Sequence, residues 1–241
     1  MTYCVGLLLE EGMVLLSDTR TNAGLDNIAT YRKMFTFEEP GNRAIAVMTA
    51  GSLSVTQTTI ARLDEAMTDS EATPETSIML APSMLKVAEM IGRTLAGVST
   101  EVAGKIGAKA DTARASLIVA GQRKDGEMRL FLIYPEGNFI EATPDTPFLQ
   151  IGEHKYGKPI LDRVVQTNTS IEDGKKAVLL SMDSTLRSNL SVGMPLDMVV
   201  IERDGLKVAE EQRIEDQDPR FLAISAAWSD ALRGAFSGIE L

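Results

Sequence analysis

Thr2 is the residue in this sequence whose position suggests covalent chemistry most directly. It follows Met1 and opens the apolar stretch Thr2-Tyr3-Cys4-Val5-Gly6-Leu7-Leu8-Leu9, with no leader or signal peptide expected before it. The small side chain of Thr2 permits removal of Met1, which would leave Thr2 with a free α-amine beside its own hydroxyl. These two groups are a nucleophile and a base in one residue. A threonine at position 2 is also common in proteins where it is inert, so the interpretation needs support from other residues.

Two charged side chains could tune such an amine. Asp18 ends the apolar run 13–17, which we expect to form a hairpin with the run 3–9, so that Asp18 lies at the same sheet edge as Thr2. Lys33 starts the next predicted strand. A cation there would keep the α-amine neutral near its reference pKa of about 8, and a carboxylate at Asp18 could hold that cation in place.

Two more residues complete the candidate set. Arg20 follows Asp18 by two positions, on the same side of an extended segment. Gly51 precedes a predicted helix, where its N–H could stabilise an oxyanion. Ordinary explanations stay open for all four residues: Asp18 and Arg20 suit a turn, Lys33 could protect a strand edge, and Gly51 could simply link strand to helix.

The elements that must position these residues come in blocks. We predict two runs of strands, each followed by two helices, then a closing hairpin and a terminal helix. The predicted strands are 3–9, 13–17, 33–37, 44–48, 115–121, 128–134, 139–142, 148–152, 198–202 and 206–209; the predicted helices are 52–67, 84–106 with a possible break at 97–107, 155–167, 171–187 and 219–236. Blocks of this kind indicate a layered α+β fold, with helices on the outer faces of two stacked sheets. No linker divides residues 1–241, which predicts a single domain.

Composition narrows the class of protein. The formal net charge of -10 argues against nucleic acid and anionic membranes as partners. Cys4 is the single cysteine, which excludes an intrachain disulfide and fits a reducing cytosol. No apolar run approaches the ~18 residues of a membrane span, and no metal or nucleotide motif is present. We therefore expect a cytoplasmic protein without a cofactor. An apolar set around Trp228 in the terminal helix favours a docked helix or a subunit contact.

Taken together, these motifs resemble the proteasome β-subunit family of N-terminal-nucleophile (Ntn) hydrolases. The matching positions are Thr2, Ser17-Asp18-Thr19-Arg20, Arg32-Lys33-Met34-Phe35, Ala50-Gly51-Ser52, Gly152 and Arg187-Ser188-Asn189-Leu190-Ser191-Val192-Gly193. The stretches Met1–Gly6, Phe148–Gly157 and Ser181–Asn189 look most like its bacterial ancestral β-subunit group, Anbu. The resemblance covers essentially the whole chain. The motifs are short, but their joint order and spacing are specific.

The resemblance implies a four-layer αββα sandwich that forms a homo-oligomer, ring-like or helix-like. By position, Thr2 would be the nucleophile, Asp18 and Lys33 would tune its amine, and Gly51 would form the oxyanion hole. A peptide or amide substrate would add as a strand along the cleft. The residues implied in its binding are Arg20 and Asn22, from the segment 20–24, and Thr49 with its neighbour Met48.

Two positions depart from the proteasome pattern. Glu153 stands where proteasome subunits have a serine, and Ser188 stands where they have an aspartate, while Ser191 keeps its place. The proton network around the Thr2 amine must therefore differ, and Glu153 could supply the missing carboxylate charge. These departures leave two alternatives open: an enzyme for a specific small amide, or a catalytically idle assembly protein in which Met1 is retained.

Overall fold

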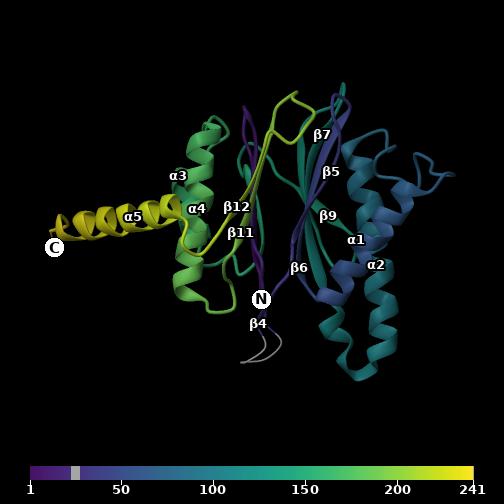
Figure 1. Ribbon diagram of the computed structural model, residues 1–241, viewed down its shortest axis with the longest axis horizontal. Helices are drawn as coiled ribbons and strands as arrows, with labels where there is room; N and C mark the ends of the chain where they lie inside the picture. Colours follow the sequence, from purple (N-terminus) through teal and green to yellow (C-terminus); the bar gives the residue numbers. More distant parts are fainter. Residues whose placement is uncertain (23–27, 241) are drawn as a thin grey trace.

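Two five-stranded antiparallel sheets stack face to face, and helices cover both outer faces (Figure 1). The computed structural model describes residues 1–22 and 28–240. The first sheet has the order β10-β1-β2-β11-β12 and consists of β1 (Tyr3–Leu8), β2 (Gly12–Asp18), β10 (Phe148–Gly152), β11 (Leu196–Glu202) and β12 (Glu210–Ile214). The second has the order β5-β6-β7-β8-β9 and consists of β5 (Met34–Glu39), β6 (Arg43–Gly51), β7 (Ala115–Arg123), β8 (Arg129–Ile133) and β9 (Phe139–Glu141).

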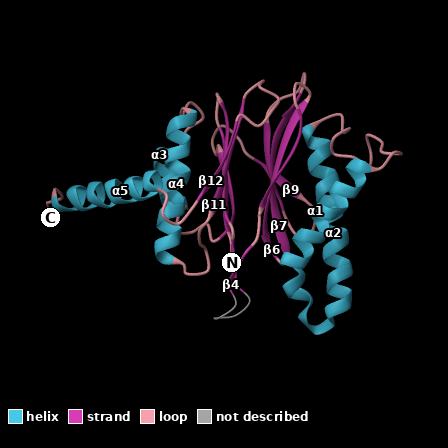
Figure 2. Ribbon diagram, viewed as in Figure 1, coloured by secondary structure: helices cyan, strands magenta, loops and turns pink. Residues whose placement is uncertain are grey.

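The helices form the outer layers shown in Figure 2. The second sheet is covered by α1 (Leu53–Thr68) and α2 (Met84–Ile106), after which the chain continues in a short 3₁₀ helix (Gly107–Ala113). The first sheet is covered by α3 (Lys158–Val164) and α4 (Ile171–Ser188), followed at the end of the chain by α5 (Pro219–Ser237). A small ribbon of β3 (Arg20–Asn22) and β4 (Ile28–Thr30) lies beside the sheets. The predicted αββα sandwich is therefore present.

Three apolar layers explain why the central strands are almost continuously apolar. On β1, Tyr3, Val5 and Leu7 face α3 and α4, whereas Cys4 faces the second sheet. Side chains alternate across a strand, so a strand with both faces buried needs apolar residues at nearly every position. All seven residues of β2 are buried for this reason.

One predicted strand and one predicted helix differ from the structure. The last strand is Glu210–Ile214, so the predicted strand 206–209 is wrong. Asp204 and Leu206 both adopt positive φ, and the turn therefore extends further along the chain. The predicted helix 155–167 is only Lys158–Val164, with a proline in its first turn, because residues 154–157 form a turn.

The helix α2 has no break at 97–107 and runs unbroken to Ile106. One of its glycines allows a close approach to a neighbouring loop. A Cβ atom on Gly92 would lie 2.2 Å from the carbonyl oxygen of Gly137. The glycine therefore serves packing between the helix and the loop that precedes β9.

Candidate active site

Thr2 lies at the start of β1 with 7% of its surface exposed. Its carbonyl oxygen accepts a hydrogen bond of 2.7 Å from the backbone N–H of Glu153. Gly152 makes this approach possible, because it has a φ of +82° and a Cβ atom there would lie 1.9 Å from the Thr2 oxygen. The first sheet therefore holds the Thr2 backbone in place from the β10 side.

Asp18 is fully buried at the end of β2, next to the start of β1. Its Oδ1 accepts hydrogen bonds from Lys33 Nζ at 2.8 Å and from the backbone N–H of Tyr3 at 3.1 Å. Its Oδ2 accepts one from the N–H of Gly193 at 3.3 Å. Burial raises the pKa of Asp18, and the Lys33 ammonium and the two N–H groups act in the opposite direction. The carboxylate thus ties together three segments that are far apart in the sequence.

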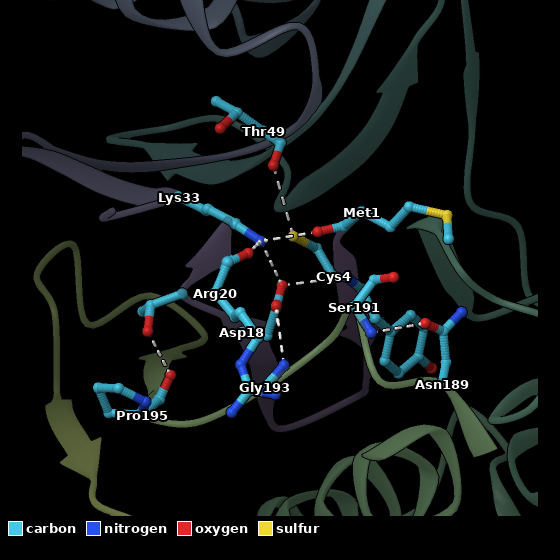
Figure 3. A network of polar contacts seen from close by, with 12 residues as sticks. Met1, Cys4, Asp18, Arg20, Lys33, Thr49, Asn189, Ser191, Gly193 and Pro195 are labelled. Carbon is cyan, nitrogen blue, oxygen red and sulfur yellow. Dashed lines mark hydrogen bonds and ion pairs between the residues drawn. The ribbon is translucent and has the colours of Figure 1, made fainter. Parts of the chain in front are cut away.

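Lys33 is 4% exposed and uses its ammonium at the centre of this network (Figure 3). Besides Asp18, Nζ donates to the carbonyl oxygens of Arg20 at 2.6 Å and of Met1 at 3.3 Å. An ammonium has three protons to donate, so these acceptors match its donors and fix its position. The cation is therefore directed at the first peptide group of the chain.

The amine at the start of the chain, carried here by Met1, is sensitive to this arrangement. Burial lowers its pKa, and the charge of Lys33 lowers it further. Asp18 and Glu153 act in the opposite direction and raise it. The net effect lowers the pKa of this amine from its ordinary value, which shifts the balance towards the neutral amine.

A cavity of about 290 Å³ opens beside Thr2. Its lining is formed by Met1, Thr2, Thr21, Lys33, Thr49, Ala50, Gly51, Leu53 and Thr56. Thr49 lines this cavity, whereas Met48 is fully buried in the core between the sheets. Apart from Lys33, the side chains around the cavity are uncharged.

Gly51 ends β6 at the rim of this cavity and has a φ of +111°. A Cβ atom there would lie 2.5 Å from the carbonyl oxygen of Arg114 on the neighbouring chain segment. A side chain is therefore excluded on two grounds, backbone conformation and space. The position is restricted to glycine next to the residue proposed as nucleophile.

Glu153 lies near the chain start, and Ser191 lies in the loop after α4. Glu153 has a side chain 17% exposed, and its charge acts on the terminal amine. Ser191 is half-buried in the loop after α4, where its N–H donates to Asn189 Oδ1 at 2.9 Å (Figure 3). Ser188, at the aspartate position of proteasomes, is the exposed last residue of α4.

Arg20 and Asn22, which the resemblance implies in substrate binding, both belong to β3. The Arg20 side chain donates to the carbonyl oxygen of Leu190 at 3.2 Å, while its own carbonyl accepts from Lys33. Thr21, not Arg20, lines the cavity. Asn22 ends β3, and its side chain lies outside the part of the chain that the structure describes, as do residues 23 and 24.

Several residues of the site were not identified from the sequence. Backbone donors such as the N–H groups of Tyr3 and Gly193 leave no signal in residue type, because any residue carries an N–H. Leu53 and Thr56 line the cavity only once the second sheet and α1 are placed beside Thr2, whereas Thr21 belongs to the segment 20–24 that the resemblance implies along the cleft. The predicted helix after Gly51 was the one signal in the sequence that could have placed Leu53 and Thr56 near the site.

Two kinds of feature are absent among the described residues. No group of three or more His, Cys, Asp or Glu side chains is arranged to hold a metal ion. No helix within residues 1–22 and 28–240 is long and apolar enough to cross a membrane.

Comparison with known proteins matches this geometry to one family. The family model described as Proteasome subunit matches residues 2–201. An Anbu (Gly-1) mutant from Hyphomicrobium sp. strain MC1 is 47% identical, covers 100% of this chain and 99% of that chain, and superposes with a TM-score of 0.92. Anbu from Yersinia bercovieri is 42% identical, with 99% and 97% covered and a TM-score of 0.92.

A third structure, described as the helical assembly of the Anbu complex from Pseudomonas aeruginosa, gives the same values of 42%, 99%, 97% and 0.92. A search of curated proteins gives no match. The family model covers most of the chain, and the structural relatives cover nearly all of it at over 40% identity. The chain therefore belongs to the proteasome family of Ntn-hydrolase folds, within its Anbu group.

Proposed function

We propose that this chain is a threonine-type amide hydrolase whose nucleophile is Thr2, exposed by removal of Met1. The observation that supports this most strongly is the buried Asp18–Lys33 pair, whose ammonium is directed at the first peptide group. A structural ion pair alone does not require a cavity beside it. Here the cavity opens at the same point, with Thr2 and Gly51 in its lining.

The proposed reaction begins with the neutral α-amine of Thr2, which takes the proton of the Thr2 hydroxyl. Oγ then attacks the carbonyl carbon of the substrate amide, and the N–H of Gly51 stabilises the resulting oxyanion. The C–N bond breaks, and the leaving amine departs with the proton that the α-amine had taken. The remaining ester of Thr2 is cleaved by a water molecule, which the same α-amine activates.

The surroundings of Thr2 support separate roles for the other site residues. Lys33 keeps the α-amine neutral, and Asp18 holds Lys33. Glu153 adds a negative charge near the amine and takes the place of the aspartate missing at Ser188, while Ser191 adds a polar group from the loop after α4.

The cavity supports a substrate with an uncharged group before the cut bond, because its free side chains are uncharged. Thr49 would contact that group, and Arg20 and Asn22 would lie along an extended peptide added beside β3. The cavity volume of about 290 Å³ also suits a small amide. A hydrolase or transferase for a specific small amide is therefore the second candidate, favoured by the altered positions Glu153 and Ser188.

The chain would act as a homo-oligomer, which the helical assembly of the Pseudomonas aeruginosa relative supports. We place it in the cytoplasm. A catalytically idle assembly protein of the same fold is the remaining alternative. It is favoured if Met1 stays attached, because the Thr2 nitrogen then remains in a peptide bond and cannot act as the base.

Hydrolysis of a panel of fluorogenic peptides and small aryl amides tests the proposal. Thr2→Ser should retain measurable turnover, whereas Thr2→Ala should lose it, because only the alanine lacks a nucleophilic oxygen. Equal turnover by the wild type and Thr2→Ala would exclude Thr2 as the nucleophile. Peptides turned over at least tenfold faster than small amides would support the peptidase, and the reverse order would support the second candidate.

A further inference from the structure

The side chain of Arg20 is engaged by a loop of the protein itself. Its guanidinium Nη1 donates to the carbonyl oxygen of Leu190 at 3.2 Å. The same group lies against Gly193, because a Cβ atom built on that glycine would overlap Nε, Cζ and Nη2 of Arg20 (Figure 3). Arg20 thus touches both ends of residues 190–193, which follow α4 and include Ser191. Residues 190–193 are called the clamped loop below.

Gly193 lacks a side chain for reasons of space. Its backbone does not adopt the positive φ that favours glycine, so an alanine would fit the backbone conformation. The Arg20 guanidinium instead occupies the place where a Cβ atom would be. A planar guanidinium can rest on a glycine with its face and still donate from its edge to a carbonyl oxygen. The two residues therefore form one contact, which a substitution of either would break.

The clamped loop reaches the ion pair of the site through Gly193. The Gly193 N–H donates to Asp18 Oδ2 at 3.3 Å, and the Gly193 carbonyl oxygen accepts from the N–H of Thr19 at 3.4 Å. Both bonds are longer than the usual range of about 2.7–3.2 Å. A small displacement of the clamped loop would therefore break them.

The main chain of Arg20 supports the same ion pair from its other side. The Arg20 carbonyl oxygen accepts a hydrogen bond from Lys33 Nζ at 2.6 Å. That ammonium lies 2.8 Å from Asp18 Oδ1. Arg20 is therefore connected to Lys33 directly and to Asp18 through the clamped loop.

We propose that Arg20 is a positioning residue of the Thr2 site, whose guanidinium holds the clamped loop so that the Gly193 N–H stays on Asp18. Burial opposes the charge of Asp18, and the Gly193 N–H is one of the groups that counter this effect and lower the pKa. Without that donor, the carboxylate holds Lys33 less firmly, and the ammonium is less well placed to keep the α-amine neutral. The effect on turnover rests on the proposed hydrolase, whereas the clamp itself is a property of the folded chain.

Substrate binding by the Arg20 side chain is the competing role. The guanidinium already contacts Leu190 and Gly193, and Arg20 is not part of the cavity lining. The two roles predict different kinetics. Loss of a substrate contact raises KM and leaves kcat unchanged, whereas loss of a positioning contact lowers kcat and leaves KM unchanged.

Hydrogen exchange of the full-length chain tests the clamp without any activity. Arg20→Ala should speed the exchange of the amides in residues 189–193 about tenfold, because the loop opens locally more often. Gly193→Ala displaces the guanidinium from the other side and should have the same effect. Arg62→Ala is the matched control, since Arg62 pairs with Glu101 on the exposed surface of α1 and α2, and its exchange and kinetics should equal those of the wild type.

Steady-state kinetics then separates the two roles. Arg20→Ala should lower kcat about tenfold with KM unchanged, the scale for loss of one hydrogen bond to a charged group. Arg20→Lys keeps the charge but has no planar face for the glycine, so it should not recover kcat. Unchanged exchange in Arg20→Ala would overturn the proposal, as would a raised KM with unchanged kcat or full recovery by Arg20→Lys. A wild type without turnover, together with faster exchange in Arg20→Ala, would support the clamp and overturn the hydrolase.

Discussion

Nζ of Lys33 lies 2.8 Å from Oδ1 of Asp18, with the two side chains 5% and 0% exposed. Each charge depends on the other, because an unpaired charge in such surroundings is costly. Lys33 of this pair also donates to the carbonyl oxygen of the first peptide group. Removal of one charge should therefore affect both stability and activity, and removal of both charges should separate the two effects.

Lys33→Met should lower the free energy of unfolding by about 3 kcal/mol, because it leaves the buried Asp18 carboxylate without a counter-ion. The double variant Asp18→Asn with Lys33→Met removes both charges and should recover most of that loss in urea denaturation. Amide hydrolysis should be absent from both variants. A Lys33→Met protein that is as stable and as active as the wild type would exclude a role for the pair.

Glu153→Gln should move the acid limb of the pH–rate profile to lower pH. Glu153 raises the pKa of the Met1 amine, and we expect it to act in the same direction on the Thr2 amine once Met1 is removed. Its removal should therefore lower that pKa and leave the amine neutral at more acidic pH.

Lys155→Gln is the matched control for Glu153. Its Nζ lies 4.0 Å from Glu153 Oε2, but the side chain is 68% exposed and therefore screened by solvent. Its pH profile should coincide with that of the wild type. If Glu153→Gln leaves both the position of the acid limb and the turnover unchanged, the carboxylate does not tune the amine.

Gly51→Ala should reduce kcat by about 10²-fold, as expected for the loss of an oxyanion donor. The new Cβ atom would meet the Arg114 carbonyl at 2.5 Å, and alanine disfavours a φ of +111°. The backbone N–H would therefore be displaced from the cavity rim. Steady-state kinetics on the best amide substrate provides the measurement.

Gly97→Ala serves as the comparison, because it lies in α2 with nothing within 4 Å of the added Cβ atom. It should raise the free energy of unfolding by about 0.5–1 kcal/mol and leave kcat unchanged. If Gly51→Ala behaves like Gly97→Ala in kinetics, the N–H of Gly51 does not stabilise the reaction.

The layers of the fold were predictable from the sequence because buried positions follow a regular spacing of apolar residues. The doubly buried strands β1 and β2 are almost continuously apolar, and the helix stripe of α2 has steps of three and four. The strand 206–209 was misplaced because the positive φ of Leu206 is rare for leucine and cannot be read from residue type.

The candidate site was predictable where it depends on side-chain chemistry. Thr2, Asp18 and Lys33 have distinctive groups at specific spacings, and the structure brings them together. The N–H of Gly193 and the lining residues Leu53 and Thr56 were missed, since a backbone donor and a neutral cavity wall depend on tertiary placement. The sequence left a docked terminal helix and a subunit contact open, and the projection of α5 from the body was not predicted.

Intact mass spectrometry after treatment with a peptide epoxyketone tests the central claim about Thr2 most directly. This reagent forms a ring with both the hydroxyl and the free α-amine of an N-terminal threonine. We predict that the wild type has lost Met1 and gains the mass of one reagent molecule, and that Thr2→Ala gains none. A wild-type chain that retains Met1 and stays unlabelled, or a Thr2→Ala chain that is labelled equally, would contradict the account.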